Sequence, residues 1–220
     1  MTVSLCILPV PTLPQNRAAV SSAILSLPFG KEDADRLLAM SNRSALAERL
    51  AARRALAALL EQEGISPRPI LRTPTGKPYF EGESSPAFSL SHTKTLAVAA
   101  LSVSPTPIGV DLETCTSTRN IDALASRYFT RDEYETWKAS PTPHEDFFRL
   151  WTQKEAQAKI HGEGLARLLC GEEPPKPFLR SFQIIKGEAR SLLTLGATAP
   201  IHEIRWHFPA KEIEIHERQN

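Results

Sequence analysis

The chain lacks paired cysteines, a targeting segment and a long apolar run. Its three cysteines, at positions 6, 115 and 170, are far apart and form no CxxC pair, which is typical of reduced cytosolic thiols. The N-terminal segment has no basic region and is interrupted by prolines, so it does not predict a signal peptide. No apolar run approaches the roughly 18 residues that span a bilayer. We therefore expect a cytoplasmic protein without membrane contact.

The charge balance and the missing motifs exclude further classes of function. Lys and Arg number 26 against 25 Asp and Glu, a net charge of +1, whereas a nucleic-acid binder shows a strongly basic balance or stripe. The sequence has no HExxH, GxSxG or GxGxxG motif and no His/Cys cluster with zinc spacing. Zincin, serine hydrolase and Rossmann dehydrogenase functions have no support, and any recognition of a polyanion must be local.

The chain does contain helices and strands in two comparable sets. Its 220 residues suffice for one large domain or two small ones. Pro105-Thr-Pro107 lies near the midpoint, and each half carries helices and about three strands. We predict an α+β fold of two pseudo-symmetric lobes, residues 1–107 and 108–220, each a small, mainly antiparallel sheet with packed helices. The expected strands are 3–10, 87–91, 96–102, 108–113, 178–185, 191–195 and 203–208, and the expected helices are 33–63 with a break near Ser41-Asn42, 121–128, 131–138 and 145–160.

An acidic strand opens the second half. In Gly109-Val-Asp111-Leu-Glu113, apolar and acidic residues alternate, so both carboxylates project to the same face of the strand. Asp-x-Glu is common by itself and also fits the solvated face of an edge strand.

An acidic helix follows about forty residues later. Phe147, Trp151, Glu155 and Lys159 stand at successive four-residue steps and share one face. An exposed Glu–Lys pair of small energetic value is the alternative, but a carboxylate aligned with aromatic residues is shielded and requires a metal or cation partner. Combined with the acidic strand, this helix supplies three hard oxygen donors and a cation, which fit a magnesium-bound phosphate site.

Cationic residues in the first half offer phosphate ligands. Arg49 and Arg53 lie one turn apart on a predicted helix, and arginine binds phosphate through bidentate hydrogen bonds. The segment Arg72-Thr-Pro-Thr-Gly-Lys77-Pro78 is no P-loop, because the upstream glycine and the Ser or Thr after the lysine are absent. It fits either a turn that presents Lys77 and backbone N–H groups to an anion or a plain loop. The arginines equally fit ordinary helix-surface charge.

Taken together and in order, these segments resemble the 4′-phosphopantetheinyl transferase superfamily, and most of all its longer, two-lobed monomeric branch, the type that activates surfactin synthetase. The resemblance covers about residues 45–165, and its most specific part is the pair of acidic motifs at their separation. The matching segments are Ala45-Leu-Ala-Glu-Arg49-Leu-Ala-Ala-Arg53, Thr75-Gly76-Lys77-Pro78, Phe88-Ser-Leu-Ser91-His92, Gly109-Val-Asp111-Leu-Glu113 and Trp151-Thr-Gln-Lys-Glu155-Ala-Gln-Ala-Lys159, followed by Gly162-Glu-Gly164-Leu165.

The resemblance implies a transferase that moves 4′-phosphopantetheine from coenzyme A to a serine of an apo acyl or peptidyl carrier protein and releases 3′,5′-ADP. Coenzyme A would lie in the cleft between the lobes of a monomer. The implied ligands of Mg²⁺ are Asp111, Glu113 and Glu155. The residues implied to act in catalysis are Glu155, Lys159 and His92, and those implied to bind coenzyme A are Arg49, Arg53, Arg72, Thr73, Gly76, Lys77, Ser91, His92 and Lys159.

Three details stay open at this level. Thr93 stands where many family members have serine, and a slip of one residue exchanges Arg53 and Arg54. The carrier-docking surface is expected to be basic and apolar, with Arg119, Arg127 and Phe129 as candidates. Two other functions use the same residues: an Mg²⁺-dependent hydrolase of a nucleotide diphosphate, and a non-catalytic protein that binds coenzyme A or a carrier.

Overall fold

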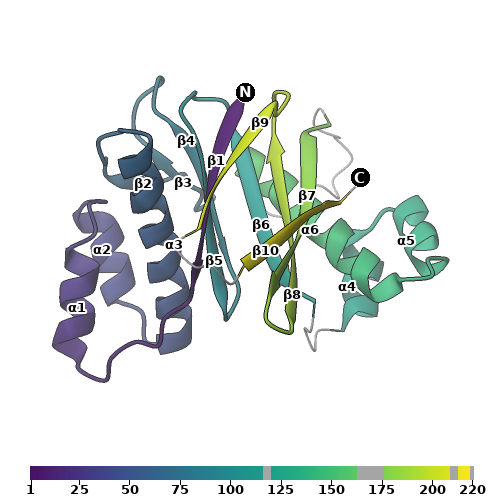
Figure 1. Ribbon diagram of the computed structural model, residues 1–220, viewed down its shortest axis with the longest axis horizontal. Helices are drawn as coiled ribbons and strands as arrows, with labels where there is room; N and C mark the ends of the chain where they lie inside the picture. The colour runs from purple at the N-terminus through teal and green to yellow at the C-terminus, as the bar shows by residue number, and fades with distance from the viewer. Residues whose placement is uncertain (116–119, 163–175, 209–212, 219–220) are drawn as a thin grey trace.

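Two four-stranded sheets lie face to face between two helical layers (Figure 1). The computed structural model describes residues 1–115, 120–162, 176–208 and 213–218. The helices are α1 (Arg17–Leu25), α2 (Lys31–Leu38), α3 (Arg43–Gln62), α4 (Ile121–Tyr128), α5 (Arg131–Lys138) and α6 (Pro143–His161). The strands are β1 (Thr2–Pro9), β2 (Ile70–Arg72), β3 (Pro78–Phe80), β4 (Ala87–His92), β5 (Leu96–Ser102), β6 (Ile108–Thr114), β7 (Phe178–Lys186), β8 (Ala189–Ala197), β9 (Glu203–His207) and β10 (Ile213–Arg218).

The two sheets draw unequally on the two halves of the chain. The first sheet has the order β4-β5-β1-β9, and the second has the order β10-β7-β8-β6. All neighbours are antiparallel except β1 and β9, which pair in parallel. Strand β9 therefore crosses from the second half of the chain to the first sheet. The division into lobes at residue 107 remains a prediction, and membership of the first sheet does not follow it at β9.

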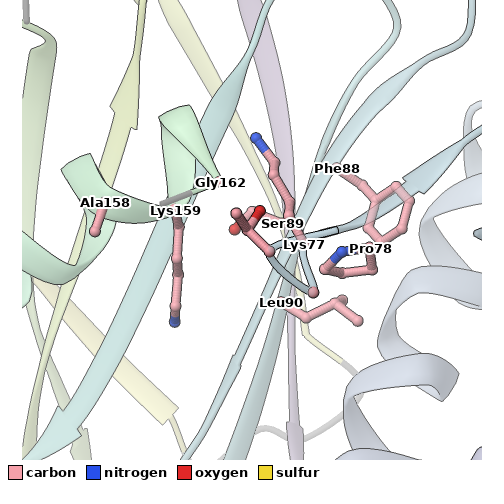
Figure 2. A pocket seen from close by; sticks show the side chains of 10 residues that line it. Lys77, Pro78, Phe88, Ser89, Leu90, Ala158, Lys159 and Gly162 are labelled. Atoms are coloured by element: carbon pink, nitrogen blue, oxygen red, sulfur yellow. The ribbon is translucent and has the colours of Figure 1, made fainter. Parts of the chain in front are cut away.

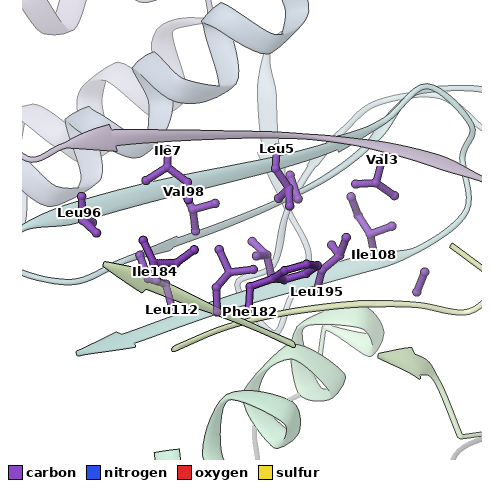
Figure 3. Close-up of a cluster of buried hydrophobic side chains, with 14 residues drawn as sticks. Val3, Leu5, Ile7, Leu96, Val98, Ile108, Leu112, Phe182, Ile184 and Leu195 are labelled. Atoms are coloured by element: carbon purple, nitrogen blue, oxygen red, sulfur yellow. The ribbon is translucent and has the colours of Figure 1, made fainter. Parts of the chain in front are cut away.

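The core fills the space between the sheets (Figure 3). Alternating residues of β1 and β5, such as Val3, Leu5 and Val98, point from the first sheet toward Leu112, Phe182 and other residues of the second. All are at most 2% exposed. Because side chains alternate along a strand, the neighbouring residues point outward, where the helices cover them.

Helix α6 covers the second sheet at very short range. A Cβ atom added to Gly109 on β6 would lie 2.1 Å from Ala156 O and 2.8 Å from Ile160 N of α6. Only a residue without a side chain allows the helix backbone to approach a strand this closely. Gly109 therefore sets the distance between α6 and the acidic strand.

Serine side chains join the two sheets where β4 meets β6. Ser89 Oγ accepts a hydrogen bond from Val110 N at 3.0 Å, and Ser91 Oγ accepts one from Leu112 N at 3.2 Å. Both serines are buried. These hydroxyls satisfy amides of the edge strand β6 that would otherwise be buried without partners.

The α+β class is confirmed, and so are the expected helices and strands, including the break before Asn42, whose side chain caps α3 by accepting from Ala45 N. Helix α1 and strand β10 were not predicted, and the turn-rich segment after Pro67 contains the hairpin β2–β3. Gly164 and Leu165 lie outside the described residues. Within the described residues, each helix is too short or too polar to cross a bilayer.

Replacing Gly109 with alanine should destabilise the protein by about 3 kcal/mol, the upper end of overpacking costs, because backbone atoms of α6 cannot yield to the new methyl group. The matched control is Gly196→Ala. Gly196 pairs with Gly109 across the β6–β8 ladder, and its added methyl group would meet only the side-chain ends of Leu179 and Ile160. Urea unfolding should show a loss of about 1 kcal/mol or less for the control. Equal losses would contradict the short-range packing.

Candidate functional site

The acidic strand faces helix α6, as its alternation predicted. Val110 and Leu112 belong to the core between the sheets, so Gly109, Asp111 and Glu113 lie on the opposite face of β6. Asp111 is 5% exposed, and Glu113 is partly buried. The two carboxylates therefore lie side by side beneath α6.

Lys159 binds the acidic strand directly. Its Nζ donates to Asp111 Oδ1 at 2.8 Å, to Val110 O at 3.0 Å and to Ser91 Oγ at 3.0 Å. An ammonium group has three hydrogens to donate, so these described contacts use all of them. Lys159 thus fixes α6 to both β6 and β4.

One oxygen of Asp111 lacks a partner. Asp111 Oδ2 is buried and makes no hydrogen bond within the described residues. A buried carboxylate oxygen without a donor is costly, and carboxylate oxygens are the ligands that Mg²⁺ prefers. The donor chemistry and the orphaned oxygen fit a divalent cation at Asp111.

The other two predicted carboxylates lie on β6 and on the facing helix α6. Glu113 Oε1 accepts from Trp151 Nε1 at 3.3 Å. Glu155 lies on α6 one turn from Trp151 and one turn from Lys159, which contacts Asp111. In the described ranges no three His, Cys, Asp or Glu side chains already form a cluster that could hold a metal ion. The predicted metal ligands thus share one region, and their joint coordination of Mg²⁺ remains a prediction.

Arginines gather in a pocket of about 570 Å³ between α2, α3 and the β2–β3 hairpin. Arg49, Arg53, Arg72, Gly76 and His92 all line it. The resemblance assigned all five to coenzyme A, and the fold brings them to one cavity. Arg36 of α2, which the sequence analysis missed, lines the same pocket.

Arg53 and Arg54 differ sharply in their surroundings. Arg53 is 4% exposed and forms a bidentate pair with Asp33, with Nε to Oδ2 and Nη2 to Oδ1 both at 2.7 Å. Arg54 is exposed and lies outside the pocket lining. Arg53 is the pocket residue, but its charge is already matched by a buried carboxylate.

The turn after β2 is held by hydrogen bonds between its own residues. Arg72 Nη1 donates to Gly76 O at 2.6 Å, and Lys77 N donates to Thr73 Oγ1 at 3.1 Å. Burial, together with the nearby Arg53, lowers the pKa of Arg72. A group of like charges at this position favours an anionic ligand.

Lys77 closes the C-terminal end of α6. Its Nζ donates to Ile160 O at 2.6 Å, and burial lowers the pKa of its ammonium group. The helix ends at Gly162, whose φ of +71° is left-handed, and a Cβ atom there would meet Lys77 Cδ at 2.8 Å. Lys77 therefore links the two sides of the cleft in this structure.

His92 is oriented by Glu48. His92 Nδ1 lies 3.0 Å from Glu48 Oε2, and His92 is half-buried. Burial lowers the pKa of His92, with Glu48 opposing this effect and Lys159 and Arg49 adding to it. A histidine held at one ring nitrogen has a defined orientation for contact through the other.

A second pocket of about 260 Å³ continues the first toward Lys159 (Figure 2). Gly76, Pro78 and Leu90 line both pockets, so the two pockets adjoin, and together they are called the cleft. Figure 2 shows Lys159 and Ala158 of α6 on one side and Pro78 and Leu90 on the other. The cleft runs from the arginine pocket to Lys159, which pairs with Asp111.

The structure corrects one carrier-docking candidate. Phe129 is 8% exposed and packs against Trp137 and Phe147, so it belongs to the core beneath α4 and α5. The Phe129 side chain therefore packs in the core and is not a surface for carrier docking. Arg127 is exposed on α4, beside the Tyr128 ring. Arg119 lies outside the described residues.

The acidic strand and α6 lie in a segment that is similar to known proteins. The profile of the 4′-phosphopantetheinyl transferase superfamily matches residues 107–215, which contain both acidic motifs. Residues 107–215, about half of the chain, belong to this superfamily. The arginine pocket lies outside the matched residues, so the match bears on the acidic end of the cleft.

Characterised members of the superfamily show the same likeness. The chain is 41% identical over 88 residues to the 4′-phosphopantetheinyl transferase HetI of Nostoc sp., and the match covers 39% of this chain and 37% of HetI. It is 37% identical over 94 residues to the 4′-phosphopantetheinyl transferase psf-1 of Bacillus pumilus, covering 41% of this chain and 38% of the relative. A 4′-phosphopantetheinyl transferase of Bacillus subtilis is 37% identical over 93 residues, 41% of this chain and 40% of the relative. The chain spans less than half of each of these relatives.

Some residues of the site carry weak sequence signals. Asp33 and Glu48 are partners of predicted site residues, yet they sit on helices rich in other charges. Ser89 stands two residues before Ser91, and this period-two pair on one strand face was the available signal. Nothing in the order of residues tells which carboxylate pairs with which arginine.

We predict that Asp33→Asn lowers the free energy of unfolding by about 3 kcal/mol, because it leaves the Arg53 guanidinium buried without a counter-charge. Asp35→Asn is the control, since Asp35 makes an exposed pair with Lys31 on the same helix. Exposed pairs contribute well under 1 kcal/mol. Thermal and urea unfolding measure both changes. A loss at Asp33 as small as that at Asp35 would show that the buried pair does not hold α2 on α3.

Proposed function

We propose that the protein transfers 4′-phosphopantetheine from coenzyme A to a serine of an apo carrier protein and releases 3′,5′-ADP in a Mg²⁺-dependent reaction. The observation that carries this proposal is the cleft itself. At one end it is lined by Lys159, which pairs with buried Asp111 inside the segment that matches the superfamily, and at the other it is an arginine-lined pocket.

The names of the relatives support the reaction. HetI and psf-1 are both named 4′-phosphopantetheinyl transferases, and their likeness to this chain supports the same activity here. Coenzyme A carries a diphosphate and a separate 3′-phosphate. The cleft offers cations at two places, as such a substrate requires.

The arginine pocket suits the 3′-phosphoadenosine end. Arg49 and Arg72 line it, and among the described residues neither makes an ion pair with a carboxylate. Arginine binds phosphate with two parallel hydrogen bonds. The side walls include Leu37 and Met40, which are apolar surfaces against which a base can lie.

The acidic end suits the diphosphate and its cation. Asp111 would hold Mg²⁺ through its unpaired Oδ2, with Glu113 and Glu155 as the further carboxylates. Bound Mg²⁺ would neutralise charge on the diphosphate and so favour departure of the leaving group. His92 and Lys159 would contact phosphate oxygens, and Lys159 would do so by giving up its present hydrogen bond to Val110 O.

The chemical step needs a proton acceptor and correct alignment. The carrier serine oxygen attacks the phosphorus that bears pantetheine, the bond to the bridging oxygen breaks, and 3′,5′-ADP leaves. The serine proton passes to Glu155 or to a water that Glu155 orients. Phosphoryl transfer gains most of its rate from positioning and charge stabilisation, which are the properties the cleft provides.

The proposal predicts that an apo carrier protein incubated with the enzyme, coenzyme A and Mg²⁺ gains one phosphopantetheine group in its intact mass. Asp111→Asn should lower the rate at least 100-fold, because it weakens the metal ligand and the pair with Lys159. Asp132→Asn on exposed α5 is the control and should keep the wild-type rate.

Other outcomes identify the alternative functions. Loss of coenzyme A without any carrier would indicate a hydrolase. Binding of coenzyme A without turnover of any carrier, and unaffected by removal of Mg²⁺, would indicate a binding protein. Full activity of Asp111→Asn would show that the metal assignment is wrong.

A further prediction concerns the 3′-phosphate. Arg49→Gln should raise the Kd for coenzyme A about tenfold, because it removes a charged phosphate contact, but should leave the Kd for dephospho-coenzyme A nearly unchanged. Arg54→Gln, a nearby exposed position on the same helix, should alter neither value. Titration calorimetry measures the Kd of each ligand for the wild-type protein and for both variants. An equal effect of Arg49→Gln on both ligands would place the 3′-phosphate elsewhere.

A further inference from the structure

Ser91 has no hydrogen bond left for a ligand. Its Oγ accepts from Leu112 N at 3.2 Å and from Lys159 Nζ at 3.0 Å, and it donates to Asp111 Oδ1 at 2.9 Å. A hydroxyl has one hydrogen and two lone pairs, so these contacts use its full capacity. Ser91 is also only 6% exposed. A direct contact with coenzyme A, as the resemblance implies, would require one of these bonds to break.

The bonds of Ser91 define the orientation of Asp111. Ser91 and Lys159 both donate to Oδ1, from β4 and from α6. Two donors from rigid elements fix the orientation of a carboxylate, and Oδ2 remains as a buried oxygen without a partner among the described residues. Asp111 Oδ1 is thus held by two donors, whereas Oδ2 is available to a ligand.

We propose that Ser91 is a positioning residue that holds Asp111 so that Oδ2 is available to the divalent cation, and that Ser91 does not bind coenzyme A. This inference rests on the proposed function for the identity of the cation as Mg²⁺. It assigns Ser91 to the acidic end of the cleft, where it acts through Asp111.

Ser89 provides a matched control within the same strand. It lies on the same face of β4, is 5% exposed, and its Oγ accepts from Val110 N at 3.0 Å. Each serine therefore joins β4 to β6 by accepting a hydrogen bond from a different backbone amide of β6. Among the described contacts only Ser91 adds a bond to Asp111 and one from Lys159.

The test compares Ser91→Ala, Ser91→Thr and Ser89→Ala in the full chain. The thermal midpoint is followed while MgCl₂ is added, and coenzyme A binding is measured by calorimetry in EDTA. Ser91→Ala should raise the Mg²⁺ concentration at half-maximal stabilisation about tenfold and keep the coenzyme A Kd within twofold of wild type. Ser89→Ala should keep the wild-type Mg²⁺ concentration, although it loses a comparable seam bond. Ser91→Thr, which retains the hydroxyl, should restore Mg²⁺ binding.

Opposite results would overturn the inference. A tenfold loss of coenzyme A affinity in EDTA for Ser91→Ala would make Ser91 a substrate-binding residue. Equal Mg²⁺ responses of the two alanine variants, or no Mg²⁺ response of the wild-type protein, would remove the positioning role. The carrier mass assay on the wild-type protein stands apart: its failure with an intact Mg²⁺ response would reject the transferase and leave the role of Ser91 in place.

Discussion

The site depends on the short distance between helix α6 and strand β6. Gly109 lets the helix backbone rest directly on the strand, with Ala156 O only 2.1 Å from where a Cβ atom would lie. At this separation the stripe of α6 that carries Trp151, Glu155 and Lys159 reaches the acidic face of β6. A side chain at position 109 would push α6 outward and move Lys159 away from Asp111, Val110 O and the serine of the other sheet.

The same contact connects the chemistry to the stability of the fold. Lys159 joins α6 to β6 and β4, so a helix and one strand of each sheet meet at one ammonium group. The serine bonds of the β4–β6 seam run beside it. A ligand that binds Asp111 or Lys159 therefore acts on the junction of the two sheets.

The sequence predicted the features that depend on local periodicity. The alternation of residues 109–113 placed Asp111 and Glu113 on one face, and the polar Asn42 marked the start of α3. Helix α1 was missed because its residues are mostly small, with only Val20 and Ile24 buried. Strand β10 was not predicted, although Ile213 and Ile215 alternate with polar residues.

The pairing of charges was the part that the sequence left undetermined. Arg53 and Arg54 are equivalent by composition, and only the rotation of α3 in the fold buries one beside Asp33 and exposes the other. Likewise the partner of Lys159 lies 48 residues away on another element. Periodicity sets the face of an element on which a residue lies, whereas long-range packing decides which opposite charge it meets.

Pairing also explains how a chain of net charge +1 can hold a polyanion. Arg53 is neutralised by buried Asp33, and Lys159 by Asp111. Arg36 pairs with Glu32, but both side chains are more than half exposed, and such a pair is worth little against a phosphate. Among the described residues Arg49 and Arg72 form no ion pair with a carboxylate, so the arginine end of the cleft keeps a local surplus of positive charge. The surplus depends on which cations pair with a carboxylate in the fold. Counting the cations in the sequence therefore does not reveal it.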